Sequence, residues 1–341
     1  MPAHPAPAAS NTPHTLLPLS LLATGKALPS RCVSSEALDR ELGRAPGYVQ
    51  QKSGIHQRHY AGSSESQAEL AAAALRDAMA RGGIAAGSID LLLSASGVPD
   101  QALPAMSCRI LEPAGLRPGT PAFDVNASCL GFLAALQMAA GLLASGAYRR
   151  IAITACDLAS RGIDWADPEA SLIFGDGAAA VIVEAGDGRQ GILAQRFETH
   201  PSGKQMCEVR AGGTARNPRT GVQAQDFLFA MQGRAVFKLV SGLLDGFLQR
   251  LFSGSGRGLH DVDLVVPHQA SHLSMQHLQK RLGLAPQRVV DIYANHGNQV
   301  CASIPTALHE AVTSGRARRG SQLLMLGSAA GVTLGGMVLA L

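Results

Sequence analysis

Aromatic and charged side chains are both scarce in this chain of 341 residues. Phe, Tyr and Trp together make up 4% of the sequence, with a single tryptophan, and the four charged residue types make up 16%. So few aromatic rings argue against a stacking platform for single-stranded nucleic acid. The net charge is +4, and no block of about five or six like charges occurs. We therefore expect no nucleic-acid partner.

Apolar runs of membrane-spanning length and paired cysteines are also missing. No stretch reaches the roughly 18 to 20 uninterrupted apolar residues of a membrane span. Before Leu16 there is no Lys or Arg, and Pro18 interrupts the short apolar run, which argues against a signal peptide. The cysteines form no CxxC pair, so we expect no zinc site, no disulfide framework and a cytoplasmic location. They are Cys32, Cys108, Cys129, Cys156, Cys207 and Cys301.

The sequence is 46% hydrophobic, with long runs of Ala, Gly, Leu and Val. Such runs suit elements buried on both faces, as in a sheet between helix layers. The chain also repeats itself: a helix and an apolar strand over 70–83 and 91–97 are echoed over 236–252 and 263–271. The pattern predicts an α/β fold built from two copies of one unit.

A second echo extends the repeat. In each half a strand, a polar turn, a helix that stops at a Ser-Gly pair and another strand follow one another. The matching segments are strands 122–125 and 289–295, helices from about 130 and over 303–313, Ser-Gly pairs 145–146 and 314–315, and strands 151–157 and 322–328. We expect residues 1–13 to be a disordered tail, with a first strand over 15–24 and two halves over 14–187 and 188–341.

Cys129 lies in the string AFDVNASCLGF (122–132), where an apolar strand breaks through small residues into a helix. Unpaired backbone N–H groups and the macrodipole favour negative charge at a helix N-terminus. We therefore expect the pKa of the Cys129 thiol to be lowered, so that it reacts as the thiolate.

Two further polar residues occupy comparable positions. His268 follows an apolar strand in VVPHQAS, and Asn298 lies in the turn of HGNQVCASIP, with Cys301 expected to pack beside it. Sites in α/β sheets form at the carboxyl ends of strands, so two related halves would bring these residues to one cleft. A Cys, a His and an Asn suit acyl transfer: the thiolate accepts an acyl group, and the other two donate hydrogen bonds to a thioester carbonyl.

These residues sit in strings that resemble β-ketoacyl-acyl-carrier-protein synthase III, a condensing enzyme of the thiolase superfamily. The strings are DVNASCLGF, LIFGDGAAAVIV, VVPHQAS, HGNQVCASIP and GVTLGGMVL, in the family's order. The resemblance runs from about residue 15 to the end. It implies a thiolase-like fold, with a duplicated α/β half and mixed five-stranded sheets in a layered α-β-α-β-α arrangement, and a homodimer.

The resemblance also implies roles for single residues. Cys129 would carry the acyl group, while His268 and Asn298 would bind the malonyl thioester carbonyl and stabilise the enolate formed on decarboxylation. The backbone N–H groups of Cys129 and Ala330 would form an oxyanion hole, although the family usually has Gly at the second position. Acyl-coenzyme A and a malonyl thioester would be the substrates and acyl carrier protein a partner, with no metal or redox cofactor needed.

Further matching positions bear on substrate binding. They are Tyr48, Lys52, Arg161 and Ser271 for coenzyme A, and Lys238 for carrier docking. Tyr48 replaces a tryptophan of the family, Lys52 an arginine and Ser271 an asparagine. Leu273 replaces a basic residue of the docking surface. These departures imply an accessory or secondary-metabolism homologue.

The loop over 100–107 matches one that reaches across the family's dimer to close the partner's acyl pocket. A bulky aromatic there restricts the pocket to short acyl groups, so Leu103 implies a medium or longer primer. Leu103 also cannot act as the carboxylate base that non-decarboxylating relatives place in this loop.

Three functions are compatible with these residues. The leading hypothesis is a decarboxylative Claisen condensation with a malonyl thioester, or with a β-ketoacyl thioester as extender. An acyltransferase of the same fold would instead move the acyl group to oxygen or nitrogen without forming a C–C bond. Asn298 favours condensation, because the carboxylate that some such relatives carry there would repel an enolate. The third, a non-catalytic partner subunit, fits poorly because Cys129, His268 and Asn298 are all present.

Overall fold

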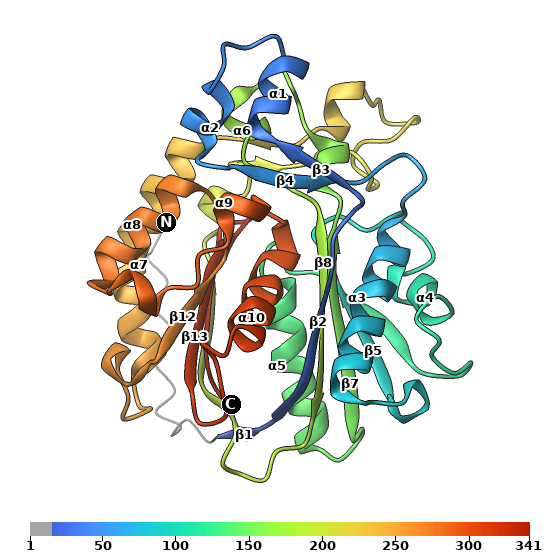
Figure 1. The fold of residues 1–341 in the computed structure, drawn as a ribbon, viewed down its shortest axis with the longest axis vertical. Helices are drawn as coiled ribbons and strands as arrows, with labels where there is room; N and C mark the ends of the chain where they lie inside the picture. The colour runs from blue at the N-terminus through green and yellow to red at the C-terminus, as the bar shows by residue number, and fades with distance from the viewer. Residues whose placement is uncertain (1–15) are drawn as a thin grey trace, which may run out of the picture.

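The computed structural model describes residues 16–341, and the predicted tail over 1–13 lies outside the described residues. Two five-stranded mixed sheets stand side by side, with helices between them and on their outer faces (Figure 1). The layers therefore follow the order helix, sheet, helix, sheet, helix. The predicted α/β class and the two mixed five-stranded sheets are confirmed.

The first sheet has the strand order β2-β8-β7-β5-β6. Its strands are β2 (Ser20–Ala27), β8 (Gly177–Glu184), β7 (Arg150–Asp157), β5 (Leu91–Ala95) and β6 (Ala122–Val125). β5 runs parallel to β6 and β7, while β8 runs antiparallel to β7 and β2. Helices α3 (Gln67–Gly82) and α4 (Met106–Leu111) cover its outer face with small apolar side chains.

The second sheet has the strand order β1-β9-β14-β13-β12. Its strands are β1 (Leu17–Pro18), β9 (Gly191–Thr199), β14 (Thr333–Ala340), β13 (Gln322–Ala329) and β12 (Leu264–Pro267). Only β12 and β13 are parallel neighbours. Helices α7 (Gly233–Phe252) and α8 (His272–Leu282) pack on its outer face. The predicted first strand is split, because β1 joins this sheet and β2 joins the other.

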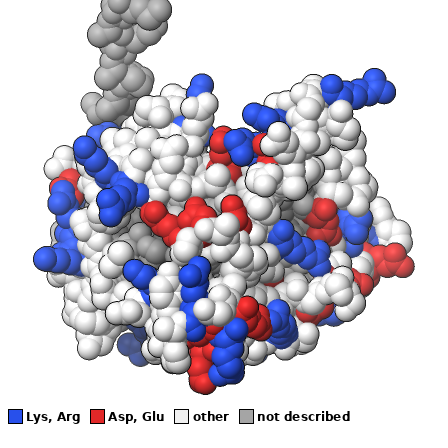
Figure 2. Space-filling view, turned by 90° about the horizontal axis from the view of Figure 1, so that it is seen from above, with Lys and Arg blue, Asp and Glu red and all other residues white. Residues whose placement is uncertain are grey.

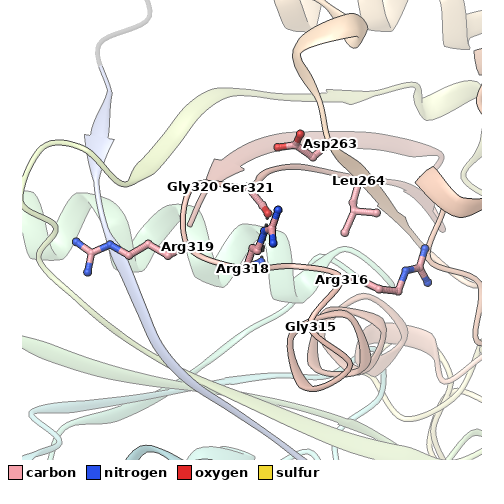
Figure 3. Close-up of a pocket in the computed structure, with 8 residues that line it drawn as sticks. All are labelled: Asp263, Leu264, Gly315, Arg316, Arg318, Arg319, Gly320 and Ser321. Carbon is pink, nitrogen blue, oxygen red and sulfur yellow. Dashed lines mark hydrogen bonds between the residues drawn. The ribbon is translucent and has the colours of Figure 1, made fainter.

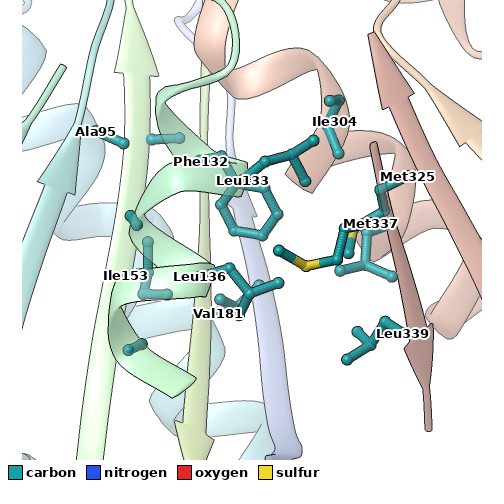
Figure 4. Close-up of a cluster of buried hydrophobic side chains, with 14 of the residues drawn as sticks. Ala95, Phe132, Leu133, Leu136, Ile153, Val181, Ile304, Met325, Met337 and Leu339 are labelled. Atoms are coloured by element: carbon teal, nitrogen blue, oxygen red, sulfur yellow. The ribbon is translucent and has the colours of Figure 1, made fainter. Parts of the chain in front are cut away.

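Two helices, α5 (Gly131–Ala144) and α10 (Ser303–Thr313), form the middle layer. Phe132, Leu133 and Leu136 of α5 pack among apolar side chains from both sheets and from α10 (Figure 4). Each large apolar side chain that is fully buried contributes about 1.5–3 kcal/mol, so this layer ties the two sheets together. Both helices end at their predicted Ser-Gly pairs, where Gly146 and Gly315 adopt φ values of 72° and 75°.

The strand predicted over 289–295 is wrong. Val289 makes only an isolated bridge to β12, and Tyr293–His296 form a short helix, α9. In the segment 289–295, side chains supply hydrogen bonds that a neighbouring strand would supply in a sheet. Gln269 bonds to backbone groups of the segment through both ends of its amide, and Asp291 accepts an N–H at the start of α9.

A small cap lies over the carboxyl ends of the parallel strands, at the top of Figure 1. It contains β3 (Arg31–Ser34), β4 (Gln57–Tyr60), α1 (Ser35–Glu41), α2 (Tyr48–Ser53) and α6 (Pro168–Ser171). A further two-stranded ribbon consists of β10 (Cys207–Glu208) and β11 (Ala230–Met231). The division into halves at 187/188 stays a prediction; it falls between β8 and β9, which belong to different sheets. Among residues 16–341, no helix is long and apolar enough to cross a membrane.

Candidate active site

Cys129 sits on a tight elbow between β6 and α5. Ser128, immediately before it, adopts a φ of 51°, which is rare for a residue other than glycine. The Asn126 side chain stabilises the elbow by accepting the Ser128 N–H at 2.8 Å. Such strained residues cost about 1–3 kcal/mol and concentrate at functional sites. The elbow places the Cys129 sulfur at the start of the central helix.

The Cys129 thiol is not the acidic group that its position predicts. Burial, followed by the Asp157 carboxylate and the Cys207 thiol, raises the pKa of Cys129 to about 12. Backbone N–H groups of Ala330 and of Cys129 itself act in the opposite direction, since both donate to the sulfur. The expectation of a lowered pKa is therefore wrong, and the unacylated sulfur is a protonated thiol at neutral pH.

Burial is the main cause of the raised pKa, and the helix N-terminus does not offset it because other acceptors already use the first N–H groups of α5. Leu130 N donates to Ala127 O at 3.1 Å, and Gly131 N donates to Ser128 O at 3.0 Å. Phe132 N donates to the sulfur of Cys301 at 3.2 Å. The prediction that Cys301 packs beside the site is thus confirmed. A helix N-terminus lowers the pKa of a thiol through free N–H groups, and these three are occupied.

His268 directly follows β12 and is buried, with 7% of its surface exposed. Burial lowers the pKa of its imidazole to about 4, so the ring is neutral at physiological pH. Its Nδ1 atom has no hydrogen-bond partner within the described chain. A neutral ring with its proton on Nε2 donates one hydrogen bond without adding charge.

Asn298 is buried in the turn after α9 and is held from both ends of its side chain. Its Oδ1 accepts the Val300 N–H at 2.8 Å, and its Nδ2 donates to Ala270 O at 3.2 Å. A side-chain amide carries two N–H groups, so the second remains for another acceptor. Val300 itself adopts a φ of 51°, a rare conformation for a β-branched residue.

The structure brings the segments of Cys129, His268 and Asn298 together at the start of α5. A Cβ atom added to Gly327 would lie 2.7 Å from His268 Cβ and 3.1 Å from Leu130 Cδ2, so the His268 strand end borders the helix start. The Asn298 turn reaches the same place through Cys301 and its hydrogen bond from Phe132. The predicted convergence of strand ends therefore has a physical basis, and Ala330 approaches from the β13–β14 turn.

The predicted coenzyme A residues lie on or near the cap. Two cations lie near the Tyr48 ring, with Arg44 Cζ at 5.4 Å and Lys52 Nζ at 6.0 Å from its centroid. The exposed Arg161 guanidinium donates to two backbone carbonyls, Glu65 O at 2.5 Å and Gly62 O at 3.3 Å. The side chain of Ser271 caps α8 by accepting the Ser274 N–H at 3.2 Å.

Ser271 and α2 meet at one place. A Cβ added to Gly54, which ends α2, would lie 2.6 Å from His272, the residue after Ser271. Lys238 is exposed on α7, beside the edge-to-face contact of Phe237 with His277. Leu103 is 82% exposed on the β5–α4 connection, and its contact with a partner subunit stays a prediction.

One residue of the site escaped sequence analysis. Asp157 ends β7, is buried, and accepts backbone N–H groups from Gly97, Val98 and Cys301. Burial raises the pKa of Asp157 to about 7 against the lowering effect of these three donors. A carboxylate that ends an apolar strand, in IAITACD (151–157), is the signal that could have identified it.

The arginine-rich pocket of Figure 3 is a different feature. Asp263 and Leu264 line it at the amino end of β12, whereas His268 follows the carboxyl end of that strand. Arg316 there already donates to Gln287 O and Val289 O at 2.8 and 3.0 Å. Within residues 16–341, no group of three His, Cys, Asp or Glu side chains is placed to hold a metal ion. The candidate chemistry therefore belongs to the Cys129 site.

The raised pKa of Cys129 makes alkylation a direct test. Below the pKa, the thiolate fraction rises about tenfold per pH unit, so alkylation of Cys129 by iodoacetamide should keep accelerating from pH 7 to pH 10. Peptide mass spectrometry separates the six cysteines. Exposed Cys108 is the internal comparison and should be alkylated faster than Cys129 at pH 7, because the reagent reaches it freely. An alkylation rate of Cys129 that stops rising with pH near pH 7 would contradict the raised pKa.

Family comparison gives two matches. Residues 123–201 match the family described as 3-Oxoacyl-[acyl-carrier-protein (ACP)] synthase III, and residues 253–341 match the family of its C-terminal part. The chain is 34% identical over 319 residues to the beta-ketoacyl-[acyl-carrier-protein] synthase III of Thiobacillus denitrificans, covering 94% of this chain and 98% of that one. It is 33% identical over 320 residues to the protein of the same name from Rhizobium rhizogenes, with coverages of 92% and 97%.

Comparison with solved structures points to the same family. The 3-oxoacyl-(acyl carrier protein) synthase III of Pseudomonas aeruginosa superposes with a TM-score of 0.85 at 29% identity, covering 95% of this chain and 98% of that one. OleA of Xanthomonas campestris superposes with a TM-score of 0.83 over 96% and 100% of the two chains, and at 19% identity shows a shared fold alone. The protein is thus a thiolase-like condensing enzyme, an acyltransferase that belongs to the β-ketoacyl-[acyl-carrier-protein] synthase III family.

Proposed function

We propose that the protein catalyses a decarboxylative Claisen condensation between an acyl group on Cys129 and a malonyl thioester. The observation that carries the proposal is the nature of the two groups beside the thiol. His268 is held neutral by burial, and Asn298 is an amide rather than a carboxylate. Both therefore donate hydrogen bonds without repelling an enolate, which is what loss of CO₂ from malonyl requires.

The first half-reaction loads the thiol. The Cys129 sulfur attacks the thioester carbonyl of an acyl-coenzyme A or acyl carrier protein, and the coenzyme thiol leaves with the proton that Cys129 gives up. The N–H groups of Cys129 and Ala330 converge on the sulfur, which supports their proposed role as donors to the negative oxygen of the tetrahedral intermediate. Ala330 has no positive φ, so its Cβ adds no backbone strain to this role.

The second half-reaction forms the carbon–carbon bond. The C–CO₂⁻ bond of the malonyl group breaks, and its electron pair passes into an enolate whose oxygen accepts hydrogen bonds from His268 and Asn298. The enolate carbon attacks the acyl carbonyl, and the Cys129 sulfur leaves and takes up one proton from the solvent. The products are a β-ketoacyl thioester, CO₂ and the original thiol, so with that proton atoms and charge balance without a metal or redox cofactor.

We further infer that thioesters reach the site past α2 and α8, with acyl carrier protein or coenzyme A as the carrier. The Tyr48 ring, with Arg44 and Lys52 close to it, suits a stacked base with nearby phosphates, and Arg161 and Ser271 are further contact candidates. Figure 2 shows Lys and Arg side chains around the cap end with Asp and Glu side chains among them. An acidic carrier would thus meet separate cations, Lys238 among them, rather than one basic patch.

The condensation is tested with purified protein, a panel of acyl-coenzyme A thioesters from two to twelve carbons, and malonyl-acyl carrier protein. Intact-mass measurement should show one acyl adduct on Cys129 that disappears as β-ketoacyl product forms only when malonyl donor is added. Cys129→Ala should take no adduct.

An adduct that malonyl donor never discharges would instead indicate acyl transfer to oxygen or nitrogen. Protein without any adduct at Cys129 would support the non-catalytic partner subunit.

Acyl-chain preference tests a second part of the proposal, in which two copies form a homodimer. Val98 and Leu103 are 54% and 82% exposed on one loop, as expected if a partner copy covers them. If Leu103 closes the partner's acyl pocket, Leu103→Phe should shift the preferred primer to shorter chains by filling that pocket. Met138→Phe, exposed on α5, is the matched control and should keep the wild-type preference. An unchanged preference in Leu103→Phe would contradict the assignment.

A further inference from the structure

Asp157 is a buried carboxyl group that the condensation steps above do not use. It is 3% exposed, and each of its oxygens bonds to a different segment. Oδ1 accepts the N–H groups of Gly97 and Val98 at 2.8 and 3.1 Å, and Oδ2 accepts the N–H of Cys301 at 3.0 Å. A single side chain thereby joins the β5–α4 loop to the turn that carries Asn298.

The two joined segments also touch each other. A Cβ atom on Gly97 would lie 2.9 Å from Val300 Cγ1, closer than side chains tolerate, and 3.3 Å from Asp157 Oδ1. Gly97 begins the loop that leads to Leu103, and Val300 lies two residues after Asn298. The Asp157 carboxylate therefore lies where the loop that leads to Leu103 meets the turn that carries Asn298.

The turn that Asp157 holds is a strained one. Val300 adopts a φ of 51°, and a β-branched residue keeps that conformation only when its surroundings enforce it. Two hydrogen bonds flank it: Val300 N–H to Asn298 Oδ1 at 2.8 Å, and Cys301 N–H to Asp157 Oδ2 at 3.0 Å. The first depends on the Asn298 side chain itself. Backbone hydrogen bonds of Asn298 with Ile173 and Gly175 hold the turn before Val300, and Asp157 supplies the side-chain constraint directly after it.

The hydrogen bond between Asp157 and Cys301 also links the Asn298 turn to the helix that follows Cys129. Cys301, whose backbone Asp157 holds, accepts the Phe132 N–H with its sulfur at the start of α5. A displacement of Cys301 would therefore move the Asn298 turn and the end of the helix that follows Cys129 relative to each other. A misplacement of about 1 Å between reacting groups costs about a hundredfold in rate.

We propose that Asp157 is a positioning residue that fixes the Asn298 turn against the Cys129 helix for carbon–carbon bond formation. The inference rests on the proposed condensation and assigns to Asp157 a specific share of it. Loading of Cys129 uses the N–H groups of Cys129 and Ala330, which Asp157 does not contact, and the Asp157 charge itself acts against loading because it raises the pKa of the Cys129 thiol. Asp157 should therefore matter more for discharge of the acyl group by malonyl than for loading.

Asp157→Asn separates the two half-reactions. Asparagine keeps the size and one acceptor oxygen, which can stay on Gly97 and Val98, but its NH₂ group then faces the Cys301 N–H, donor against donor. Loading of Cys129 by acyl-coenzyme A, followed by intact mass, should be as fast as in wild type or faster, because the lost negative charge is one that raises the pKa of the thiol. Discharge of the preloaded protein by malonyl-acyl carrier protein should slow about tenfold to a hundredfold.

Two further variants separate positioning from general destabilisation. Asp124→Asn is the matched control, because Asp124 accepts the N–H groups of Met106 and Ser107 at 2.8 Å each but faces α4. It should lower the melting temperature without selectively slowing discharge. Val300→Gly removes the strain, since glycine adopts a positive φ freely. The double variant Asp157→Asn/Val300→Gly should therefore regain most of the lost discharge rate.

The outcomes are distinct. Equal slowing of loading and discharge in Asp157→Asn, wild-type discharge in that variant, or no rescue by Val300→Gly would overturn the inference while wild-type protein still condenses. Wild-type protein that loads Cys129 and never forms β-ketoacyl product would overturn the proposed condensation, and this inference with it.

Discussion

The burial of α5 between two sheets is the constraint on which the rest of the structure depends. Its apolar side chains contact both sheets, so its N-terminus lies between them. Cys129 precedes that N-terminus, and the segments of His268, Asn298 and Ala330 reach it from later in the chain. One packed helix thus brings residues of both sheets and of the Asn298 turn to a single candidate site, since neither sheet alone supplies all four residues.

Burial also determines the electrostatics of the site. It raises the pKa of Cys129 to about 12 and that of Asp157 to about 7, and it lowers the pKa of His268 to about 4. The free enzyme at neutral pH therefore presents a thiol and a neutral imidazole rather than an ion pair. Such a site favours chemistry in which charge appears only transiently on substrate oxygens, next to N–H groups already fixed in place.

The sequence predicted the layered α/β fold and most of its elements because periodicity and Ser-Gly stops carry that information locally. It missed the segment 289–295, where Gln269 and Asp291 take the hydrogen bonds that a strand would use. It also predicted the wrong pKa direction for Cys129. That prediction assumed free N–H groups at α5, whereas the Cys301 sulfur, 169 residues from Phe132 in sequence, accepts one of them.

Asp157 was missed for the same reason, because its three hydrogen bonds reach residues far away in sequence. No local pattern records such contacts. The residues predicted for Cys129 chemistry came from motifs, and their roles stay predictions until the half-reactions are measured.

A crystal structure of the protein acylated at Cys129 tests the central claim most directly. The account predicts that the thioester carbonyl oxygen lies within hydrogen-bond distance, about 2.7–3.2 Å, of the backbone nitrogens of both Cys129 and Ala330. His268 Nε2 and Asn298 Nδ2 should then face the open side of the thioester, where the malonyl group would bind. A carbonyl oxygen bonded instead to His268 and Asn298 would contradict the division of the site into two donor pairs.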